Sequence, residues 1–457
     1  MPTHTEVGRS DTTPIPLPTA LPYGESSMLR TRVDAYFDRM RDGHLIVGRV
    51  PCKGAVQLWS NDYLGLGGHS EIVEAQVDCL QGRSDGVFMS AVFLNETSLQ
   101  RRFERQMASY LGAEAAVLCQ SGWSANTGLV QALAEPRTPV YIDQFAHASL
   151  WEGVRMAGAQ VHVFRHNQST HLERLIQRHG SGLVLVDSVY SSDGSICQLP
   201  EISAVSERTS CVLVVDESHA IGVYGPHGEG LVHTLGLTGK VHYRTFSLSK
   251  AFATRAGMVA GPTRVMTYFP YEARPAIFSS AVLQHEVAGL AATLKVIQEE
   301  DWRRQQLWYN TRYLRQGLQD AGLAVTSSGS QIIALHGGTD AQTRALRDAL
   351  EQQGVFGAVF CAPATPKNHG IVRLSVNARL REKELDKILT ACKHITQERK
   401  INPWPKGLMR QDCAPDTSRA DVESSVEVQS NSAVAALRQL AIQMRKAAAR
   451  FSNLDLP

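Results

Sequence analysis

Seven short apolar runs, separated by stretches of helical periodicity, constrain the fold of this chain more than any other feature. The runs are AAVLCQ (115–120), VYID (140–143), AQVHVF (159–164), GLVLVDS (182–188), CVLVVDE (211–217), HYRTFSL (242–248) and AGMVAG (256–261). Unbroken apolar strands indicate burial on both faces, which is typical of a parallel sheet covered by helices. In one intervening stretch, Leu99, Phe103, Met107 and Leu111 share a helix face. We therefore predict an α/β fold with a mostly parallel sheet.

The rest of the chain divides by its patterns of hydrophobicity and composition. Shorter strand and helix patterns after residue 290 predict a second, smaller α/β domain. The expected parts are a disordered leader (1–26), an N-terminal helix with an extended segment (27–65), a large domain (66–289), a small C-terminal α/β domain (290–400), and a linker with a basic amphipathic tail helix (401–457). We interpret the tail helix as solvated or packed in a dimer. The alternatives are a membrane-surface helix and a partner-binding helix.

Composition excludes several classes of protein. The net charge of +2 gives no bulk field that would attract nucleic acid or an anionic membrane. No run of eighteen or more apolar residues is present, and the N-terminus lacks the apolar core of a secretory signal. The eight cysteines form no CxxC pair, which argues against a zinc ribbon or a disulfide scaffold and fits a reducing cytoplasm. We therefore expect a cytoplasmic protein without a metal site, a nucleic-acid partner or a membrane partner.

Polar residues follow five of the apolar runs at the points where the predicted strands end. They are Ser121, Gly122, Trp123, Asp143, His147, Asp187, Ser188, Ser191, Asp216, His219, Ser247, Ser249 and Lys250. Ligands on a parallel sheet bind beyond the carboxyl ends of its strands, so we expect these residues to meet in one crevice. A single aspartate in such a place usually caps the next helix. Polar residues after five strands together indicate a functional site.

The residue types in this set match one kind of chemistry. Lys250 lies in a serine-rich turn, TFSLSKAFATRAG, where desolvation can remove its proton and let it form an imine with an aldehyde. A buried aspartate can keep a pyridine nitrogen protonated, so that the ring accepts electrons. A histidine can stack on such a ring, and hydroxyls and amides at a helix N-terminus suit a phosphate. Together these are the groups that catalysis by pyridoxal 5'-phosphate (PLP) requires.

Eight motifs carry a resemblance that runs from about residue 60 to residue 377. They are SNDYLGL (60–66), SGWSANTG (121–128), DQFAHAS (143–149), VYSSDG (189–194), VDESHAIGVYGPHGEG (215–230), SLSKAFA (247–253), FSSA (278–281) and the strand around Arg373. In their order and spacing they resemble the α-oxoamine synthase family of fold-type-I PLP enzymes. The resemblance implies a fold-type-I PLP-dependent transferase, with a large domain on a mostly parallel sheet and a smaller C-terminal α/β domain.

The resemblance also implies roles around the cofactor ring. Lys250 corresponds to the lysine that forms the imine with PLP. Asp216 corresponds to the partner of the pyridine nitrogen, and His219 to the donor of a hydrogen bond to the ring oxygen. His147 matches the histidine that stacks on the ring, and Ser191 is expected near the ring oxygen. Of these, Lys250, Asp216, His219 and His147 form the predicted catalytic set.

Further residues correspond to positions that bind the phosphate and the substrate. Gly122 and Trp123 match backbone donors to the phosphate, and Ser121 and Ser247 are expected beside them. The family's phosphate contacts across a dimer imply the same role for Ser279 and Ser280, and therefore a homodimer with its active site at the interface. Arg373 matches the arginine that binds the substrate carboxylate, a task that suits a planar guanidinium.

Several of these residues have a structural alternative. His147 could simply cap a helix, and Trp123 could be a core aromatic residue. Ser279 and Ser280 could begin the helix at AVLQHE. Arg373 lies in an alternating strand and could be a surface residue. Lys250 has no comparable alternative, because it lies thirty-four positions after Asp216 within the SLSKAFA motif.

Within the family, the chain most resembles the α-hydroxyketone quorum-sensing autoinducer synthases of the CqsA/LqsA type. The segments that carry this are VYIDQFAHASLWEGVR (140–155), RPAIFSSAVL (274–283), SQIIAL (330–335) and VFGAVFCAPATPKNHGIVRLSVN (355–377). The type implies condensation of a medium-chain acyl-CoA with a small amino acid, either 2-aminobutyrate or S-adenosylmethionine. Carbon dioxide is lost, and the product is an α-aminoketone precursor of the signal.

Three other functions stay open from the sequence. The first is a glycine-using member of the same family, either an 8-amino-7-oxononanoate synthase or a 2-amino-3-oxobutyrate CoA ligase. The second is a PLP aminotransferase, which would use a keto acid in place of a thioester. The third is a regulatory or scaffold protein that uses its tail helix, although Lys250, Asp216 and His219 argue against a protein without catalysis.

Overall fold

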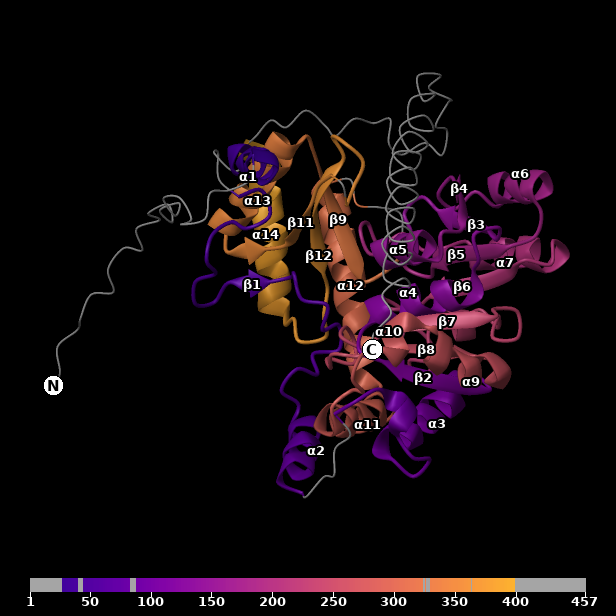
Figure 1. The fold of residues 1–457 in the computed structure, drawn as a ribbon. Helices are drawn as coiled ribbons and strands as arrows, with labels where there is room; N and C mark the ends of the chain where they lie inside the picture. The colour runs from indigo at the N-terminus through magenta and orange to yellow at the C-terminus, as the bar shows by residue number, and fades with distance from the viewer. Residues whose placement is uncertain are drawn as a thin grey trace. The chain divides into compact units, whose positions relative to one another are not determined.

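A seven-stranded sheet forms the centre of the fold, with the strand order β2-β8-β7-β6-β5-β3-β4 (Figure 1). The strands are β2 (Ala115–Cys119), β3 (Pro139–Asp143), β4 (Gln160–Phe164), β5 (Leu183–Asp187), β6 (Val212–Asp216), β7 (Tyr243–Ser247) and β8 (Gly257–Gly261). All seven predicted runs are therefore strands of this sheet. Only β8 runs antiparallel to its neighbours β2 and β7, so the carboxyl ends of the other six strands share one edge.

The computed structural model describes residues 27–39, 44–82, 88–323, 325, 329–362 and 364–398. The predicted disordered leader and the predicted linker and tail helix lie outside the described residues. The expected N-terminal helix is α1 (Ser27–Arg39). The extended stretch after it contains β1 (Val56–Gln57), which pairs in parallel with β10 (Val355–Phe356).

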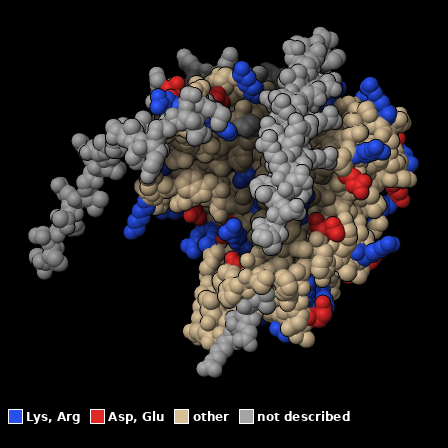
Figure 2. Space-filling view, viewed as in Figure 1, with Lys and Arg blue, Asp and Glu red and all other residues tan. Residues whose placement is uncertain are grey.

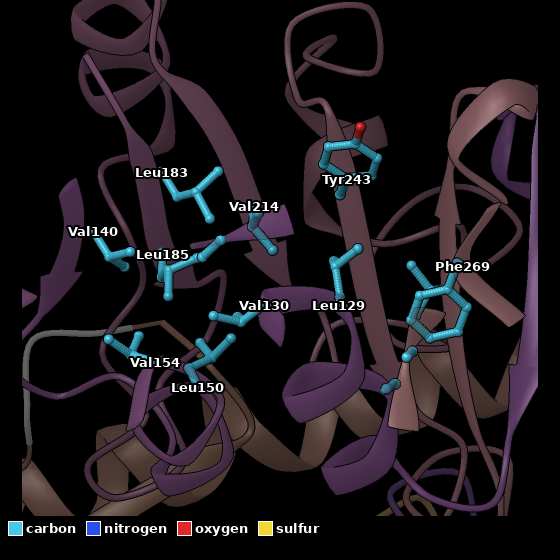
Figure 3. Packing of buried hydrophobic residues seen from close by; sticks show 14 of the residues in the cluster. Leu129, Val130, Val140, Leu150, Val154, Leu183, Leu185, Val214, Tyr243 and Phe269 are labelled. Atoms are coloured by element: carbon cyan, nitrogen blue, oxygen red, sulfur yellow. The ribbon is translucent and has the colours of Figure 1, made fainter. Parts of the chain in front are cut away.

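Helices cover both faces of the large sheet. On one face, apolar side chains of α4 (Gly122–Leu133), α5 (Ala148–Ala157) and α9 (Thr263–Glu272) pack against β3, β5, β6 and β7 in a buried cluster (Figure 3). The other helices of this part that contact the sheet include α3 (Leu99–Leu111), α6 (Ser169–His179) and α7 (Leu199–Arg208). On α3, Phe103, Met107 and Leu111 are fully buried, as the helical period predicts.

A smaller antiparallel sheet, in the order β11-β12-β9, forms the C-terminal lobe. Its strands are β9 (Ile332–Gly338), β11 (Ala358–Phe360) and β12 (Gly370–Ser375), with helices α13 (Asp340–Gln352) and α14 (Glu382–Glu398). The remaining helices are α2 (Ser70–Gln81), η1 (Ala91–Phe93), α8 (Leu231–Thr234), α10 (Arg274–Ile277), α11 (Gln284–Glu299) and α12 (Trp302–Asp320). Since residue 290 lies inside α11, we propose that the lobes divide where α11 ends and α12 begins.

Charge and hydropathy on the described part are unexceptional. Lys and Arg side chains are interspersed with Asp and Glu on the face shown in Figure 2. None of the helices in the described ranges is long and apolar enough to cross a bilayer.

A buried ion pair ties strand β7 to the turn after β6. Arg244 is 3% exposed, and its Nε donates to Oε2 of the fully buried Glu217 at 2.6 Å. Arg244 also donates to the carbonyls of Leu111 and Glu229, and the backbone N–H of Val232 donates to the other oxygen of Glu217. These further partners come from two segments, the end of α3 and the stretch 229–232, which fixes the turn beyond Asp216.

We predict that Arg244→Met destabilises the protein by about 3–5 kcal/mol, because Glu217 would remain buried without a counter-charge. The free energy of unfolding from urea titration measures the effect. The matched control is Lys240→Ala, which breaks an exposed pair between Lys240 and Glu207 and should change stability by less than about 1 kcal/mol. Equal losses in the two variants would contradict the structural role of the buried pair.

Candidate active site

Several of the residues predicted at the strand ends interact through their charges at the shared carboxyl edge of the sheet. Burial lowers the pKa of Lys250 to about 8, while the charges of Asp216 and Asp187 act against that shift and Arg373 adds to it. The charges of Asp216 and Lys250 also affect the pKa of His147 and the pKa of Asp187. Lys250, Asp216, Asp187 and Arg373 therefore lie close enough for their charges to interact, as the strand-end rule predicts.

The turn that carries Lys250 is fixed by its neighbours. Lys250 is half-buried, and Ala251 and Phe252 beside it are buried almost completely. The backbone N–H of Ala253 donates to the carbonyl of Lys250 at 2.9 Å, with Ala253 at φ +49°. A residue with a side chain seldom adopts this left-handed conformation, which costs about 1 kcal/mol or more and is found preferentially at functional sites. The amine is thus presented from a rigid turn.

Asp216 ends strand β6 as a buried, fully bonded carboxylate. Its Oδ2 accepts from Nδ2 of Asn126 at 2.6 Å, and its Oδ1 accepts from the N–H of Ser218 at 2.8 Å. Asn126 in turn accepts from the hydroxyl of Thr245 at 2.6 Å and donates to Ser149 at 2.8 Å. The aspartate is therefore oriented from helices α4 and α5 and strand β7.

These supporting residues were missed by the sequence analysis. Asn126 lies inside the quoted motif SGWSANTG, four residues after Gly122 and so on the same face of α4. An asparagine on the buried face of a helix is a usable signal, because a buried amide requires a polar partner. No such signal marks Thr245 and Ser149, which acquire their role only from strand and helix packing.

His147 caps helix α5. Its Nδ1 lies 2.7 Å from the hydroxyl of Ser149, and its backbone N–H donates to Asp187 at 3.1 Å. His147 is therefore the N-cap of α5, as the capping alternative predicts. Its ring lies beside Trp123 in an edge contact, with the ring centroids 6.3 Å apart. Burial lowers the pKa of His147, Asp216 opposes that shift and Lys250 adds to it, so the neutral imidazole is favoured.

The N-terminus of α4 has backbone donors to spare. Ser121 caps the helix by accepting from Ser124, while the N–H groups of Gly122 and Trp123 donate to no other described residue. A Cβ on Gly122 would lie 2.6 Å from the Cβ of Ser247, so only glycine allows this approach to β7. Trp123 is 48% exposed, and the core alternative for it is wrong. Free amides beside a serine suit an anion.

His219 lies deep in the same crevice, 4% exposed in the turn after Asp216. Its Nδ1 is 2.7 Å from the hydroxyl of Tyr63, and its carbonyl accepts from Nε2 of Gln331 at 2.8 Å. Burial places the pKa of His219 well below its usual value, and the positive charges of Lys250 and Arg373 contribute to the shift. The ring is therefore neutral.

Arg373 reaches the crevice from strand β12 of the small lobe. It is 4% exposed, so the surface alternative is wrong. Its Nη1 donates to the carbonyl of Ser191 at 2.6 Å, and its Nη2 donates to Oδ1 of Asn61 at 2.9 Å. The guanidinium stacks over Phe360, while its buried Nε has no partner among the described residues. A buried guanidinium with a spare donor suits a carboxylate ligand.

The hydrogen bonds of Ser279 and Ser280 within their own chain are to residues other than Lys250, Asp216, His147 and His219. The hydroxyl of Ser279 donates to the carbonyl of Pro275, and the carbonyl of Ser280 accepts from Gln120 at 2.6 Å. Helix α11 begins at Gln284, so the alternative that these serines start a helix is wrong. The adjacent Phe278 is 82% exposed.

The donor set fits PLP. The cofactor needs a reactive amine, an acid beside its ring nitrogen and donors for its phosphate, and the crevice contains a lysine of lowered pKa, a buried carboxylate and free helix N-terminal amides. Residues that could hold it are Lys250, Asp216, His147, His219, Ser121, Gly122, Trp123 and Ser247.

Comparison with known proteins supports this fit. The family model described as aminotransferase class I and II matches residues 53–392. The CAI-1 autoinducer synthase of Vibrio campbellii is 47% identical over 371 residues, covering 80% of this chain and 94% of the relative. The 8-amino-7-oxononanoate synthase of Exiguobacterium sibiricum is 33% identical over 352 residues, covering 76% and 90%.

Solved structures agree with the sequence relatives. A serine palmitoyltransferase of Sphingomonas wittichii superposes with a TM-score of 0.75 at 25% identity, covering 81% of this chain and 98% of the other. The predicted fold class and cofactor are thereby confirmed. The chain belongs to the aminotransferase class I and II family, and it is a PLP-dependent enzyme of the α-oxoamine synthase type.

Proposed function

We propose that the enzyme condenses a medium-chain acyl-CoA with 2-aminobutyrate or S-adenosylmethionine and releases carbon dioxide. The product is an α-aminoketone precursor of an α-hydroxyketone autoinducer. The observation that carries this is the 47% identity, over nearly the whole relative, to a CAI-1 autoinducer synthase. Identity to the 8-amino-7-oxononanoate synthase of Exiguobacterium sibiricum is 33%. The motifs quoted from the sequence favour the same choice.

Lys250 and Asp216 carry the central steps of this proposal. When bound, PLP supplies an aldehyde for the amino group of the substrate and a ring that accepts the electron pair released at the α-carbon. Nζ of Lys250, neutral near pH 8, is the base that removes the α-proton. Asp216, oriented by Asn126, holds the proton of the ring nitrogen.

Arg373 binds the substrate carboxylate through its fork of N–H donors. The α-carbon then forms a bond to the acyl carbonyl carbon, the thioester C–S bond breaks, and the thiol of CoA leaves. Cleavage of the bond to the carboxylate releases carbon dioxide, and Lys250 returns a proton to the α-carbon in its place. Negative charge on the acyl oxygen is stabilised by His147, because the single N–H of neutral His219 is needed at the ring oxygen.

A second copy of the chain completes the phosphate site in this proposal. Gly122 and Trp123 donate from the backbone and Ser247 from its hydroxyl, while Ser279 and Ser280 come from the partner subunit. Ser280 lies next to Gln120 at the end of β2, and the segment around it exposes Phe278. Exposed aromatic side chains of this size are typical of an interface.

We expect the purified protein, given a mixture of amino acids and acyl-CoAs, to yield α-aminoketones derived from 2-aminobutyrate or S-adenosylmethionine. Mass spectrometry of the products identifies both the amino donor and the acyl length. Products made from glycine alone would identify a glycine-using synthase. Transfer of an amino group to a keto acid, without use of a thioester, would identify an aminotransferase.

We predict that PLP gives the wild-type protein an absorbance band that Lys250→Ala abolishes, together with a loss of turnover of at least about a thousandfold, because both base and covalent anchor are removed. Lys240→Ala, which changes an exposed lysine, is the control and should keep both. An absorbance band in the Lys250→Ala protein that borohydride still fixes covalently to the chain would contradict the assignment of the cofactor lysine.

The lowered pKa of Lys250 predicts how cofactor uptake depends on pH. Only the neutral amine attacks an aldehyde, so the rate at which the cofactor-free protein takes up PLP should rise with pH and level off above about 8. Stopped-flow absorbance measures the rate, and N-acetyl-lysine in the same buffers corrects for the ionisation of PLP itself. After this correction, a rate that still rises tenfold per pH unit up to about pH 10 would show that the pKa of Lys250 is not lowered.

A further inference from the structure

Tyr63 is a fully buried tyrosine whose hydroxyl faces two acceptors in the crevice. It lies in the SNDYLGL segment, between β1 and α2, and is 0% exposed. Its oxygen is 2.7 Å from Nδ1 of His219 and 3.3 Å from Oδ1 of Asn61. A hydroxyl has one proton to donate, so only one of the two contacts can receive it.

The distances favour donation to the histidine. Hydrogen bonds from hydroxyls are normally 2.5–3.0 Å long, a range that contains the contact to His219 and excludes the contact to Asn61. Asn61 also has another donor, since Nη2 of Arg373 lies 2.9 Å from its oxygen. Its oxygen therefore competes weakly for the tyrosine proton.

Both rings are held in the protonation state that this donation requires. Burial raises the pKa of Tyr63 to about 12, although Arg373 and a hydrogen bond from Gln331 oppose the shift, so the hydroxyl keeps its proton. His219 is neutral, because burial and the charges of Lys250, Arg373 and His147 all lower its pKa. A neutral imidazole carries one N–H. When Nδ1 accepts a hydrogen bond, that N–H must be on Nε2.

We propose that Tyr63 is a positioning residue that fixes the tautomer of His219, so that Nε2 of the histidine presents a hydrogen-bond donor to the ring oxygen of PLP. The inference rests on the proposed place of His219 at that oxygen. Without the hydroxyl of Tyr63, Nδ1 can carry the proton, and Nε2 then turns a lone pair toward the negatively charged oxygen. Asn61, which lies beside the hydroxyl of Tyr63, accepts a hydrogen bond from Arg373 of the proposed substrate carboxylate site.

The test is a double-mutant cycle read from the absorbance of bound PLP in the full-length, cofactor-loaded protein. Tyr63→Phe should move the pH-dependent absorbance transition upward by about one unit, a tenfold change in the ionisation constant, because the ring oxygen loses a donor. His219→Leu should move it in the same direction. The double variant should match His219→Leu alone, because Tyr63 acts only through the histidine.

The control is Tyr141→Phe, which removes another buried tyrosine hydroxyl, bonded to the carbonyl of Gly180 away from the crevice. It should leave the absorbance transition unchanged. A tyrosine with a merely structural role would give effects that add in the double variant, and this result would overturn the proposal. The proposal would also be overturned if Tyr63→Phe kept the absorbance transition of the wild type while His219→Leu shifted it. That outcome would leave the proposed function intact.

A second variant covers the case in which Tyr63→Phe fails to fold. Incorporation of 3-fluorotyrosine at position 63 keeps the hydroxyl and makes it a stronger donor, so the absorbance transition should move to lower pH or stay in place. A shift to higher pH would overturn the proposal. Failure of the proposed function is recognised separately, because mass spectrometry would then find no α-aminoketone product from the wild-type protein.

Discussion

Burial of several ionisable groups at one edge of the sheet is the constraint on which the rest of the site depends. A charge removed from water is costly unless it is paired or neutralised. Here the crevice lowers the pKa of Lys250 to about 8, places that of His219 well below its usual value and raises that of Asp187 well above it. Asp216 receives two hydrogen bonds instead. The same burial that costs stability makes a lysine reactive and a histidine a neutral donor.

The large sheet was predictable because its signal is local. Each of its strands is an unbroken apolar run, and β5, in the middle of the sheet, is buried at all five positions. The edge strand β4 is largely exposed, yet its run was also found. The antiparallel direction of β8 is not encoded in its own residues. It follows from the short connection after Lys250, which returns the chain beside β7 with no helix between the strands.

The site was predictable to the extent that its residues lie at strand ends or in recognised motifs. Lys250, Asp216, His147 and His219 lie near one another beyond the strand ends, whereas Asn126 and Tyr63 were overlooked. Their roles come from contacts between segments that are distant in sequence: Asn126 lies 90 positions from Asp216, and Tyr63 lies 156 positions from His219. Secondary-structure propensity and hydrophobic periodicity depend on residues that are neighbours along the chain. They therefore cannot predict contacts between residues this far apart in sequence.

The small antiparallel sheet is joined by hydrogen bonds to the loop that follows β5. Arg373 donates to Ser191 of the large domain, and Ser330 donates to the carbonyl of Gly194 three residues further on. Gly194 has φ +73°, and a Cβ there would lie 2.5 Å from the carbonyl oxygen of Ile332. Only glycine permits this approach, so the loop 191–194 acts as the joint between the lobes.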